Sequence, residues 1–250
     1  MNPHFLQSAA WQSFQEALGR KVYRQKGIDW EFMAILEPGT RLSPSRLYCP
    51  YGPTVSSIKG LKSALKALTK LATSLGVKFV RVEPLGVKFN AKDFRLKRVN
   101  YSQPAHTWQI DLNRSSDEII SQMKQNNRNI YRNYRKKGLS YRSSNNPNDC
   151  KYLIKLLHGV AAHNNITIHS DKYLQTQADV LLPINSAKLH FISLESKVIA
   201  AALTYEDEKT CYYAHAGASH EYRKLSASTA LLAEIIINAK KDGKLICDLY

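Results

Sequence analysis

The last third of the chain carries the pattern that most constrains its fold. Strands are expected over residues 187–194, 198–206 and 210–216, because each run is apolar and is joined to the next by a short polar turn. Such short turns predict an antiparallel meander. An amphipathic helix follows, with Leu225, Leu232, Ile235 and Ile236 on one face and Gly243 as its stop, and residues 244–250 form a last strand.

Helices and strands also alternate through the rest of the chain. Apolar periodicity predicts helices over residues 4–18, 57–75, 115–138, 152–161 and 171–182, and strands over residues 32–36, 77–82, 107–112 and 139–142. Helices interleaved with strands in this way predict an α/β (α+β) fold. We place a domain boundary at residue 112, which gives domains over residues 1–112 and 113–250.

The amino-acid composition indicates which classes of partner and which cellular compartment suit this chain. A formal charge of +16 favours polyanions, namely RNA, DNA, anionic lipid head groups or phosphorylated metabolites. The four cysteines are scattered without a C-x-x-C pair, which predicts no metal site and suits a reducing compartment. Because no leader pattern and no apolar run of roughly 18 to 20 residues is present, we expect a cytoplasmic protein.

Residues 115–138 predict a single helix with a cationic face. Ser115 and Glu118 have the spacing of a capping box, and Gly138 ends the helix. No carboxylate occurs between Ile119 and Asn148, so the basic side chains have no local partner and should attract polyanions, although a solvated helix face remains the alternative. The basic side chains that we expect to bind tRNA are Lys124, Arg128, Arg132, Arg135, Lys136 and Lys137.

Seven segments carry a family resemblance in their order along the chain. They are Phe5–Trp11, Tyr51–Pro53, Phe79–Pro84, Gln103–Leu112, Met123–Gly138, Tyr213–Ser219 and Leu225–Leu232. Together they resemble the FemA/FemB/FemX family of aminoacyl-tRNA-dependent peptidoglycan-bridge transferases. The resemblance implies two tandem domains of the GNAT-like acyltransferase fold, the first without its C-terminal return segment.

The resemblance also implies a reaction and its partners. A stem-peptide amine of a lipid-linked or UDP-linked muropeptide would attack the ester carbonyl of aminoacyl-tRNA, and the ribose hydroxyl would leave. Such a protein needs no cofactor and no covalent intermediate, since it holds two polyanionic substrates in register and stabilises the oxyanion. A peripheral association with the inner face of the membrane is expected for a lipid-linked acceptor.

Matching the family pattern residue by residue gives a substrate-binding set of Glu83, His169, Tyr173 and Tyr213, with no catalytic residue assigned. Glu83 stands where the family has an aspartate, and His169 stands where it has an arginine, which removes a permanent charge. For Tyr173 and Tyr213 the alternative is a packed aromatic side chain with a hydrated hydroxyl group.

The end of the chain departs from the family pattern. Family members continue past the last strand with a segment that holds a lysine, whereas this chain ends at Tyr250. We therefore expect a homodimer or another cover for the first domain and weak transferase activity. Lys240, Lys241 and Lys244 are the nearest substitutes for the missing lysine.

Two alternative functions stay open. Arg223–Ser228 is the equivalent of the [QR]-x-x-G-x-[GA] turn that binds the pyrophosphate of CoA, and serine occupies both small positions, which argues against acetyl-CoA as the donor. A CoA-dependent N-acyltransferase would nevertheless bind CoA at this turn. A non-catalytic RNA-binding protein on the same scaffold would explain the basic helix and the missing C-terminal segment together.

Overall fold

The computed structural model describes residues 3–41 and 43–250, which divide into two compact units, Met1–Ala105 and His106–Tyr250. The boundary expected from the sequence lies seven residues later, at residue 112. Residues 106–112 belong to the second unit because β6 (Gln109–Asp111) pairs there with β11 (Ile246–Asp248).

The first unit is built on a five-stranded sheet with the order β1-β2-β3-β5, in which β4 also pairs with β2. Only the β3–β5 pair is parallel. The elements of this unit are η1 (Phe5–Gln7), α1 (Ala9–Ala17), β1 (Val22–Lys26), β2 (Trp30–Glu37), β3 (Arg46–Cys49), β4 (Thr54–Val55), α2 (Ile58–Ser74), β5 (Phe79–Val82) and η2 (Ala91–Phe94). Strand β1 is not predicted from the sequence, because its largely polar residues pair at the edge of the sheet and lack the apolar alternation of a half-buried strand.

A buried glutamine joins three segments of the first unit. The side-chain amide of Gln7 donates to the carbonyl oxygens of Met33 (3.0 Å) and Pro50 (2.6 Å), and its oxygen accepts from the backbone N–H of Met33 (2.7 Å). Gln7 is only 2% exposed. These bonds pair backbone groups of β2 and of the loop after β3 that would otherwise be buried without a partner.

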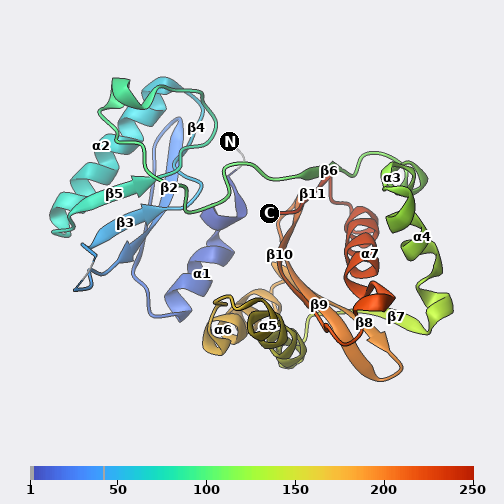
Figure 1. The fold of residues 1–250 in the computed structure, drawn as a ribbon. Coiled ribbons are helices and arrows are strands. Elements are labelled where there is room, and N and C mark those ends of the chain that lie inside the picture. The colour runs from blue at the N-terminus through green and yellow to red at the C-terminus, as the bar shows by residue number, and fades with distance from the viewer. Residues whose placement is uncertain (1–2, 42) are drawn as a thin grey trace. The chain divides into compact units, whose positions relative to one another are not determined.

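The second unit is a six-stranded sheet with the order β6-β11-β10-β9-β8-β7. Its other elements are α3 (Ser116–Gln122), α4 (Gln125–Asn133), η3 (Arg135–Lys137), β7 (Leu139–Ser144), η4 (Pro147–Asp149), α5 (Cys150–Asn164), α6 (Asp171–Leu181), β8 (Ala187–Leu194), β9 (Lys197–Glu206), β10 (Thr210–Ala218), η5 (Arg223–Leu225) and α7 (Ala227–Lys241). The predicted meander is confirmed as β8–β9–β10, and the last strand returns parallel to β10 after α7. Figure 1 shows α3, α4 and α7 on one face of this sheet and α5 and α6 on the other.

The prediction of a single basic helix over residues 115–138 is wrong, because the segment forms α3, α4 and η3. The capping box of Ser115 and Glu118 is present, but α3 ends at Gln122, and Met123 and Lys124 are extended with ψ of 145° and 141°. The guanidinium of Arg128 donates to the carbonyl oxygens of Ser121 (2.7 Å) and Met123 (3.2 Å). It therefore satisfies acceptors at the broken helix end, a role that helical periodicity alone does not reveal.

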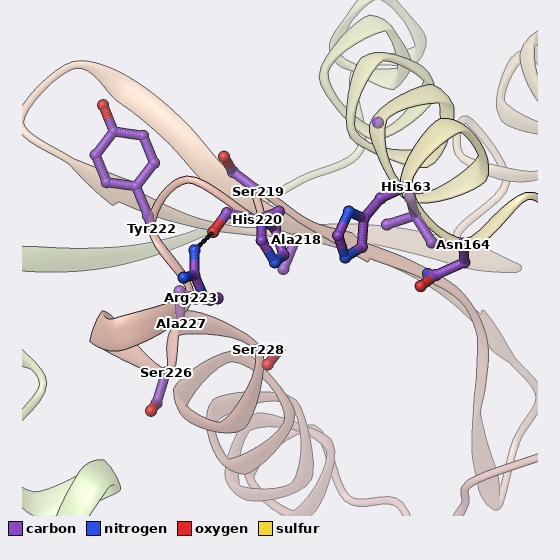
Figure 2. A pocket seen from close by; sticks show the side chains of 12 residues that line it. His163, Asn164, Ala218, Ser219, His220, Tyr222, Arg223, Ser226, Ala227 and Ser228 are labelled. Carbon is purple, nitrogen blue, oxygen red and sulfur yellow. Dashed lines mark hydrogen bonds between the residues drawn. The ribbon is translucent and has the colours of Figure 1, made fainter.

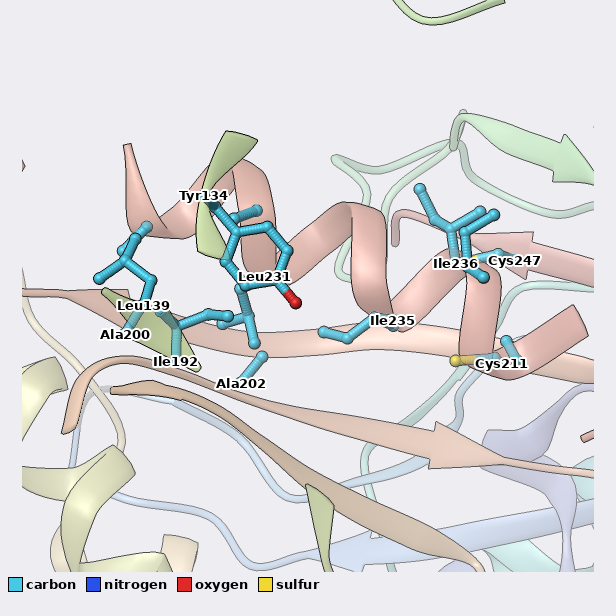
Figure 3. Packing of buried hydrophobic residues seen from close by; sticks show 14 of the residues in the cluster. Tyr134, Leu139, Ile192, Ala200, Ala202, Cys211, Leu231, Ile235, Ile236 and Cys247 are labelled. Carbon is cyan, nitrogen blue, oxygen red and sulfur yellow. The ribbon is translucent and has the colours of Figure 1, made fainter. Parts of the chain in front are cut away.

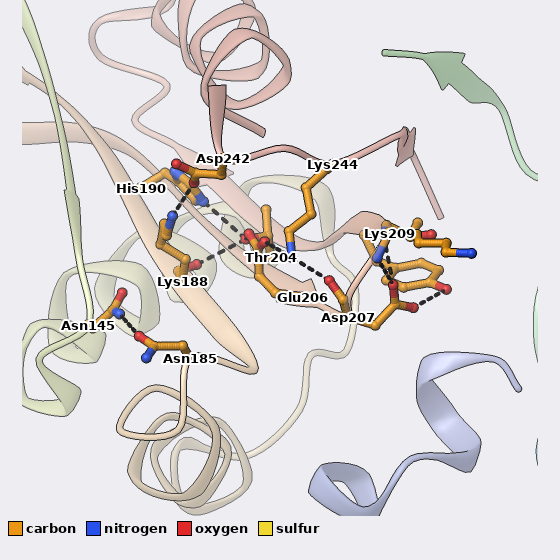
Figure 4. Close-up of polar contacts among 12 residues, drawn as sticks. Asn145, Asn185, Lys188, His190, Thr204, Glu206, Asp207, Lys209, Asp242 and Lys244 are labelled. Atoms are coloured by element: carbon orange, nitrogen blue, oxygen red, sulfur yellow. Dashed lines mark hydrogen bonds and ion pairs between the residues drawn. The ribbon is translucent and has the colours of Figure 1, made fainter. Parts of the chain in front are cut away.

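A hydrophobic core of the second unit lies between the sheet and α7. Its buried residues include Leu139, Ile192, Leu231 and Ile235, and Figure 3 shows them with the ring of Tyr134 packed over α7. The C-terminal end of α7 is joined to the sheet by polar contacts, shown in Figure 4. These are the ion pair of Lys244 with Glu206 (3.3 Å) and the ion pair of Lys188 with Asp242. Within the sheet, the hydrogen bond of His190 with Thr204 (3.0 Å) joins β8 to β9.

No helix in the described part of the chain is long and apolar enough to cross a membrane. Cys49, Cys150, Cys211 and Cys247 are all buried as free thiols. Among residues 3–41 and 43–250, no three side chains of the His, Cys, Asp or Glu types are grouped so that they could hold a metal ion.

The three bonds of Gln7 give a stability prediction. Gln7→Leu keeps the volume of the side chain but leaves three buried backbone groups without partners, so the free energy of unfolding should fall by about 2–4 kcal/mol. Gln25→Leu, at an exposed position of β1, is the matched control and should change the value by less than about 0.5 kcal/mol. Urea unfolding of both variants measures the difference, and equal losses would contradict the role given to Gln7.

Candidate functional site

A cavity of about 210 Å³ lies where β10 ends and α7 begins. Figure 2 shows side chains from three elements around it, with His163 and Asn164 from the end of α5 facing His220 and Arg223 of the β10–α7 connection. Ser226 and Ser228 of the first turn of α7 complete its wall. The unpaired N–H groups of a helix N-terminus together with an arginine favour an anionic ligand at this position.

The connection into α7 has a constrained backbone. Ser226 takes a left-handed conformation with φ of 55°, directly after η5, and the guanidinium of Arg223 donates to the carbonyl oxygen of His220 (3.2 Å). The ring of His220 stacks on the ring of His163 with 3.9 Å between centroids. Partial desolvation, and then the neighbouring His163 and Arg223, lower the pKa of His220. The imidazole pair therefore favours the neutral state of His220.

Strand β10 has an uncovered edge that begins close to its middle. Strand β11 pairs only with Thr210, Cys211 and Tyr212, and in the described part of the chain no strand pairs with Tyr213–Ala218 on that side. The register with β9 shifts between Tyr213 and His215, so Ala214 is an extra residue that forms a β-bulge. An uncovered edge offers backbone N–H and C=O groups to a ligand.

A second group of site candidates is an aromatic and histidine cluster on the α6 side of the sheet. The ring of His169 stacks on Tyr173 with 4.1 Å between centroids and meets His215 edge-on at 5.6 Å. The hydroxyl of Tyr205 lies 3.2 Å from Nε2 of His215 and accepts from the amide of Gln177 (2.7 Å). Burial, and then His169, lower the pKa of His215 to about 4, so this imidazole is neutral near pH 7.

The structure brings together only part of the predicted substrate-binding set. His169 and Tyr173 are in contact, whereas Tyr213 packs against the core cluster under α7, on the opposite face of the sheet from His215. Burial raises the pKa of Tyr213 to about 12. The bulge at Ala214 explains the separation, because it reverses the alternation of faces between Tyr213 and His215.

Glu83, in the first unit, is engaged in hydrogen bonds within that unit. One carboxylate oxygen accepts from the hydroxyl of Tyr48 (3.0 Å) and the N–H of Tyr51 (3.1 Å). The other accepts from the N–H groups of Ser102 and Gln103, both at 3.2 Å. These four bonds fasten the loop after β3 to residues 102–103, so the carboxylate positions loops, and substrate binding by Glu83 stays a prediction.

The six predicted tRNA-binding residues are spread over a broken helix. Lys124 precedes α4, Arg132 lies on it, and Lys136 and Lys137 lie in η3, all four of them exposed. Arg128 is half-buried and bonded to the end of α3. The exposed set of Lys124, Arg132, Lys136 and Lys137, called the α4 cationic face below, is therefore smaller than the sequence predicts.

The sequence near these cations contains no carboxylate, but a carboxylate from a distant part of the chain pairs with one of them. Arg135 forms an ion pair with Glu234 of α7 (3.1 Å), and Glu234 also accepts from the hydroxyl of Tyr134 and from the amide of Asn238 (3.2 Å). A cavity of about 360 Å³ adjoins this contact and is also lined by Arg132 and Lys241. Glu234 is 99 residues from Arg135 in sequence, so a local charge count does not reveal the pair.

Two of the three lysines named as substitutes have structural bonds. Lys244 is mostly buried and pairs with Glu206, and Lys240 donates to the carbonyl oxygen of Leu112 (3.0 Å). Lys241 lines the cavity beside Glu234. Within the described residues, Lys241 is thus the member of the three that adjoins a cavity.

Four residues of these sites are not predicted from the sequence. His163 and His220 are 57 positions apart, so their stacking follows from the fold and not from spacing. His215 and Tyr205 were hidden by the bulge, because a strict period of two assigns His215 to the same face as Tyr213. The distribution of histidines along the sequence was a signal for these sites. Half of the eight histidines of the chain belong to them, namely His163, His169, His215 and His220.

Comparison with known proteins places the second unit in a described family. A family model described as an acetyltransferase (GNAT) domain matches residues 121–250. A search of curated proteins gives no match. The structure of FemX is similar with a TM-score of 0.85 and 15% identity, over 99% of this chain and 83% of that one.

Two further structures are similar at lower TM-scores. The C-terminal domain of a putative lysylphosphatidylglycerol synthetase from Agrobacterium fabrum gives a TM-score of 0.61 and 14% identity, over 98% of this chain and 74% of that one. The structure described as L-PGS from Bacillus licheniformis gives a TM-score of 0.59 and 14% identity, over 98% of this chain and 76% of that one. At these identities the likeness shows the fold, and it confirms the predicted FemX-like and GNAT-like architecture.

The two buried histidines give a pH prediction. Burial, and then Lys188, lower the pKa of His190 to about 3. The pKa of His215 is about 4. A histidine in the unfolded chain has a pKa of about 6.5. Below about pH 6.5 the unfolded chain therefore binds more protons, and the free energy of unfolding should decrease as the pH falls toward 4. The contribution of fully buried His190 is on the order of 3–5 kcal/mol over its whole window.

The test compares denaturant unfolding between pH 5 and pH 7, above the range in which most carboxyl groups titrate. His190→Gln and His215→Gln should each have a shallower pH dependence than the unaltered chain. His106→Gln, which changes an exposed histidine that forms no ion pair among the described residues, is the reference against which both slopes are compared. An unchanged slope in His190→Gln would contradict the assignment.

Proposed function

Because the chain belongs to the acetyltransferase (GNAT) domain family and has an acyltransferase fold, we propose that its acyl donor is aminoacyl-tRNA. Its acceptor is a stem-peptide amine of a lipid-linked or UDP-linked peptidoglycan precursor. The amine nitrogen forms an amide bond with the aminoacyl carbon, the ester bond to the tRNA ribose breaks, and the ribose oxygen leaves as a hydroxyl group. The reaction uses no cofactor.

The observation that carries this proposal is the extent of the likeness to FemX. It covers 99% of this chain, so it includes the first unit as well as the residues that match the GNAT family model. The name of one other similar structure, a putative lysylphosphatidylglycerol synthetase, denotes the joining of an amino acid to a lipid. That name and the family resemblance in the sequence both support aminoacyl transfer.

Charge supports a nucleic-acid donor. The α4 cationic face presents four exposed cations among asparagine and glutamine side chains, and the segment contains no carboxylate from Ile119 to Asn148. Such a surface contacts phosphate groups by shape and charge without reading base sequence. The formal charge of +16 on the whole chain adds long-range attraction for tRNA.

The chemistry of the candidate site fits aminolysis of an activated ester. A pKa of about 4 makes His215 a weak base at pH 7, so proton abstraction by this group would contribute little. The uncovered edge of β10 and the N-terminus of α7 instead supply N–H donors for a carbonyl oxygen that gains negative charge. Positioning and oxyanion stabilisation would therefore provide most of the rate.

A CoA-dependent N-acyltransferase is the second candidate, because the family match and the cavity before α7 both favour it. The left-handed position at the start of α7 is Ser226 and not glycine, and its side chain narrows the approach of a pyrophosphate to the backbone. The cavity can accept an anion, but the local backbone is less suited to close contact with a diphosphate.

Label transfer distinguishes the two donors. The full chain is incubated with a UDP-linked or lipid-linked muropeptide and with either aminoacyl-tRNA or acetyl-CoA, each labelled in its acyl group. We expect label in the muropeptide from aminoacyl-tRNA and none above background from acetyl-CoA. Transfer from acetyl-CoA alone would replace the proposal by the CoA-dependent alternative, and no transfer from either donor would count against an aminoacyltransferase.

Removing the α4 cationic face should weaken tRNA binding and its salt dependence. Arg132, Lys136 and Lys137 are exposed, so changing all three to Gln should leave the melting temperature nearly unchanged. Each phosphate contact that is lost should reduce the slope of log K against log salt by about 0.7–0.9. Filter binding at several salt concentrations measures the slope. Lys151, Lys155 and Lys172 changed to Gln are the matched control, and an equal slope in both triple variants would contradict the assignment.

A further inference from the structure

The first unit contains a long segment without acidic residues. Between Glu37 and Glu83 the sequence has no aspartate or glutamate, while it has eight lysine or arginine residues. Half of these cations lie on one helix, α2, as Lys59, Lys62, Lys66 and Lys70. This segment is separate from the α4 cationic face, which lies in the second unit.

The four lysines form one stripe on the outer face of α2. At 100° per residue they fall within about 80° of one another, opposite the buried Leu61, Ala64, Leu68 and Ala72. All four are exposed, and none takes part in the ion pairs formed by the described residues. The stripe is about 16 Å long, given a rise of about 1.5 Å per residue.

Two exposed isoleucines lie at the N-terminal end of this stripe. Ile58, the first residue of α2, is 48% exposed, and Ile28, in the turn between β1 and β2, is 103% exposed. The turn is fixed against α2, since the carbonyl oxygen of Asp29 accepts from the N–H of Ser56 (3.1 Å) and its carboxylate accepts from the hydroxyl of Ser57. The carboxylate of Asp29 is therefore already hydrogen-bonded.

We propose that the α2 lysine stripe and Ile28 form a docking surface for an anionic phospholipid bilayer. The lysines would lie over the head groups, and the isoleucine side chains would enter the boundary with the acyl chains. Flexible lysine side chains on a straight helix suit a diffuse negative surface, and exposed isoleucine has no role in contacts with phosphate groups. Each lysine near such a surface strengthens binding roughly fivefold.

The residues around the two cationic surfaces differ, and the difference indicates a different partner for each surface. The α4 cationic face is interspersed with asparagine, glutamine and tyrosine, which can hydrogen-bond to or stack on nucleotides. The α2 stripe is interspersed with serine, threonine and alanine and ends at bare isoleucine. The observations therefore favour lipid over RNA for α2, and the proposal does not depend on the identity of the acyl donor.

Vesicle sedimentation of the full chain tests the proposal. The probes are vesicles of phosphatidylcholine alone and vesicles in which roughly one-third of the lipid is phosphatidylglycerol. The stripe variant changes Lys59, Lys62, Lys66 and Lys70 to Gln. The control variant removes the same number of charges from exposed positions of the second unit, Lys151, Lys155, Lys172 and Lys209. Ile28→Ser alters only a fully exposed side chain, so it tests insertion without disturbing the fold.

The unaltered chain should bind the anionic vesicles and not the neutral ones. The stripe variant should bind the anionic vesicles at least tenfold more weakly, with the control within about twofold of the unaltered chain. Ile28→Ser should lose the part of binding that persists at high salt, because that part is apolar. Equal losses in the stripe and control variants would overturn the proposal. Full vesicle binding by the stripe variant, accompanied by weaker tRNA binding, would overturn it in favour of RNA.

Discussion

The position of the α4 cationic face depends on the bonds that the buried carboxylate of Glu234 forms with Tyr134 and Arg135. Glu234 lies on α7, is 4% exposed, and is bonded to the hydroxyl of Tyr134 and the guanidinium of Arg135. Burial, and then Glu234, raise the pKa of Tyr134 to about 12. The hydroxyl group of Tyr134 is therefore protonated near pH 7 and donates a hydrogen bond to the carboxylate of Glu234. Removing the carboxylate would leave the hydroxyl of Tyr134 without its acceptor and remove the ion pair of Arg135, which would loosen the contact of the end of α4 with α7.

This arrangement links stability and function through one helix. The inner face of α7 supplies Leu231 and Ile235 to the core, its first turn borders the cavity with Arg223, and Glu234 holds the segment that carries the exposed cations. A single rigid element therefore fixes both the anion-favouring cavity and the position of the α4 cationic face. In the first unit Glu83 has a comparable role, since its four hydrogen bonds join loops that are distant in sequence.

Local patterns predicted most of the elements but not their exceptions. The meander, α7 and the capping box of α3 were predictable because their apolar periods, turns and caps depend on residues close together in sequence. The break at Met123 was not, because residues 115–138 contain no proline and no internal glycine, and Arg128 supports the break through its side chain. The bulge at Ala214 likewise has no sequence signal, and it alters which residues share a face.

The candidate site was predicted less completely than the fold for the same physical reason. His169 and Tyr173 are four residues apart and meet within one local segment, so a motif could identify both. The pairs His163 with His220 and Arg135 with Glu234 join distant segments, and only the packed sheet brings them together. Charge counted along the sequence therefore overstated the number of unpaired cations on the basic segment.

Hydrogen exchange with tRNA tests the central claim, that an acyl group carried by tRNA reaches the N-terminus of α7. The chain is compared alone, with deacylated tRNA, with tRNA that carries a non-hydrolysable aminoacyl group, and with CoA. We predict slower exchange over residues 125–137 with both forms of tRNA, and slower exchange over residues 219–229 only with the aminoacylated form. Slower exchange over residues 219–229 with CoA, and none there with aminoacylated tRNA, would contradict the account.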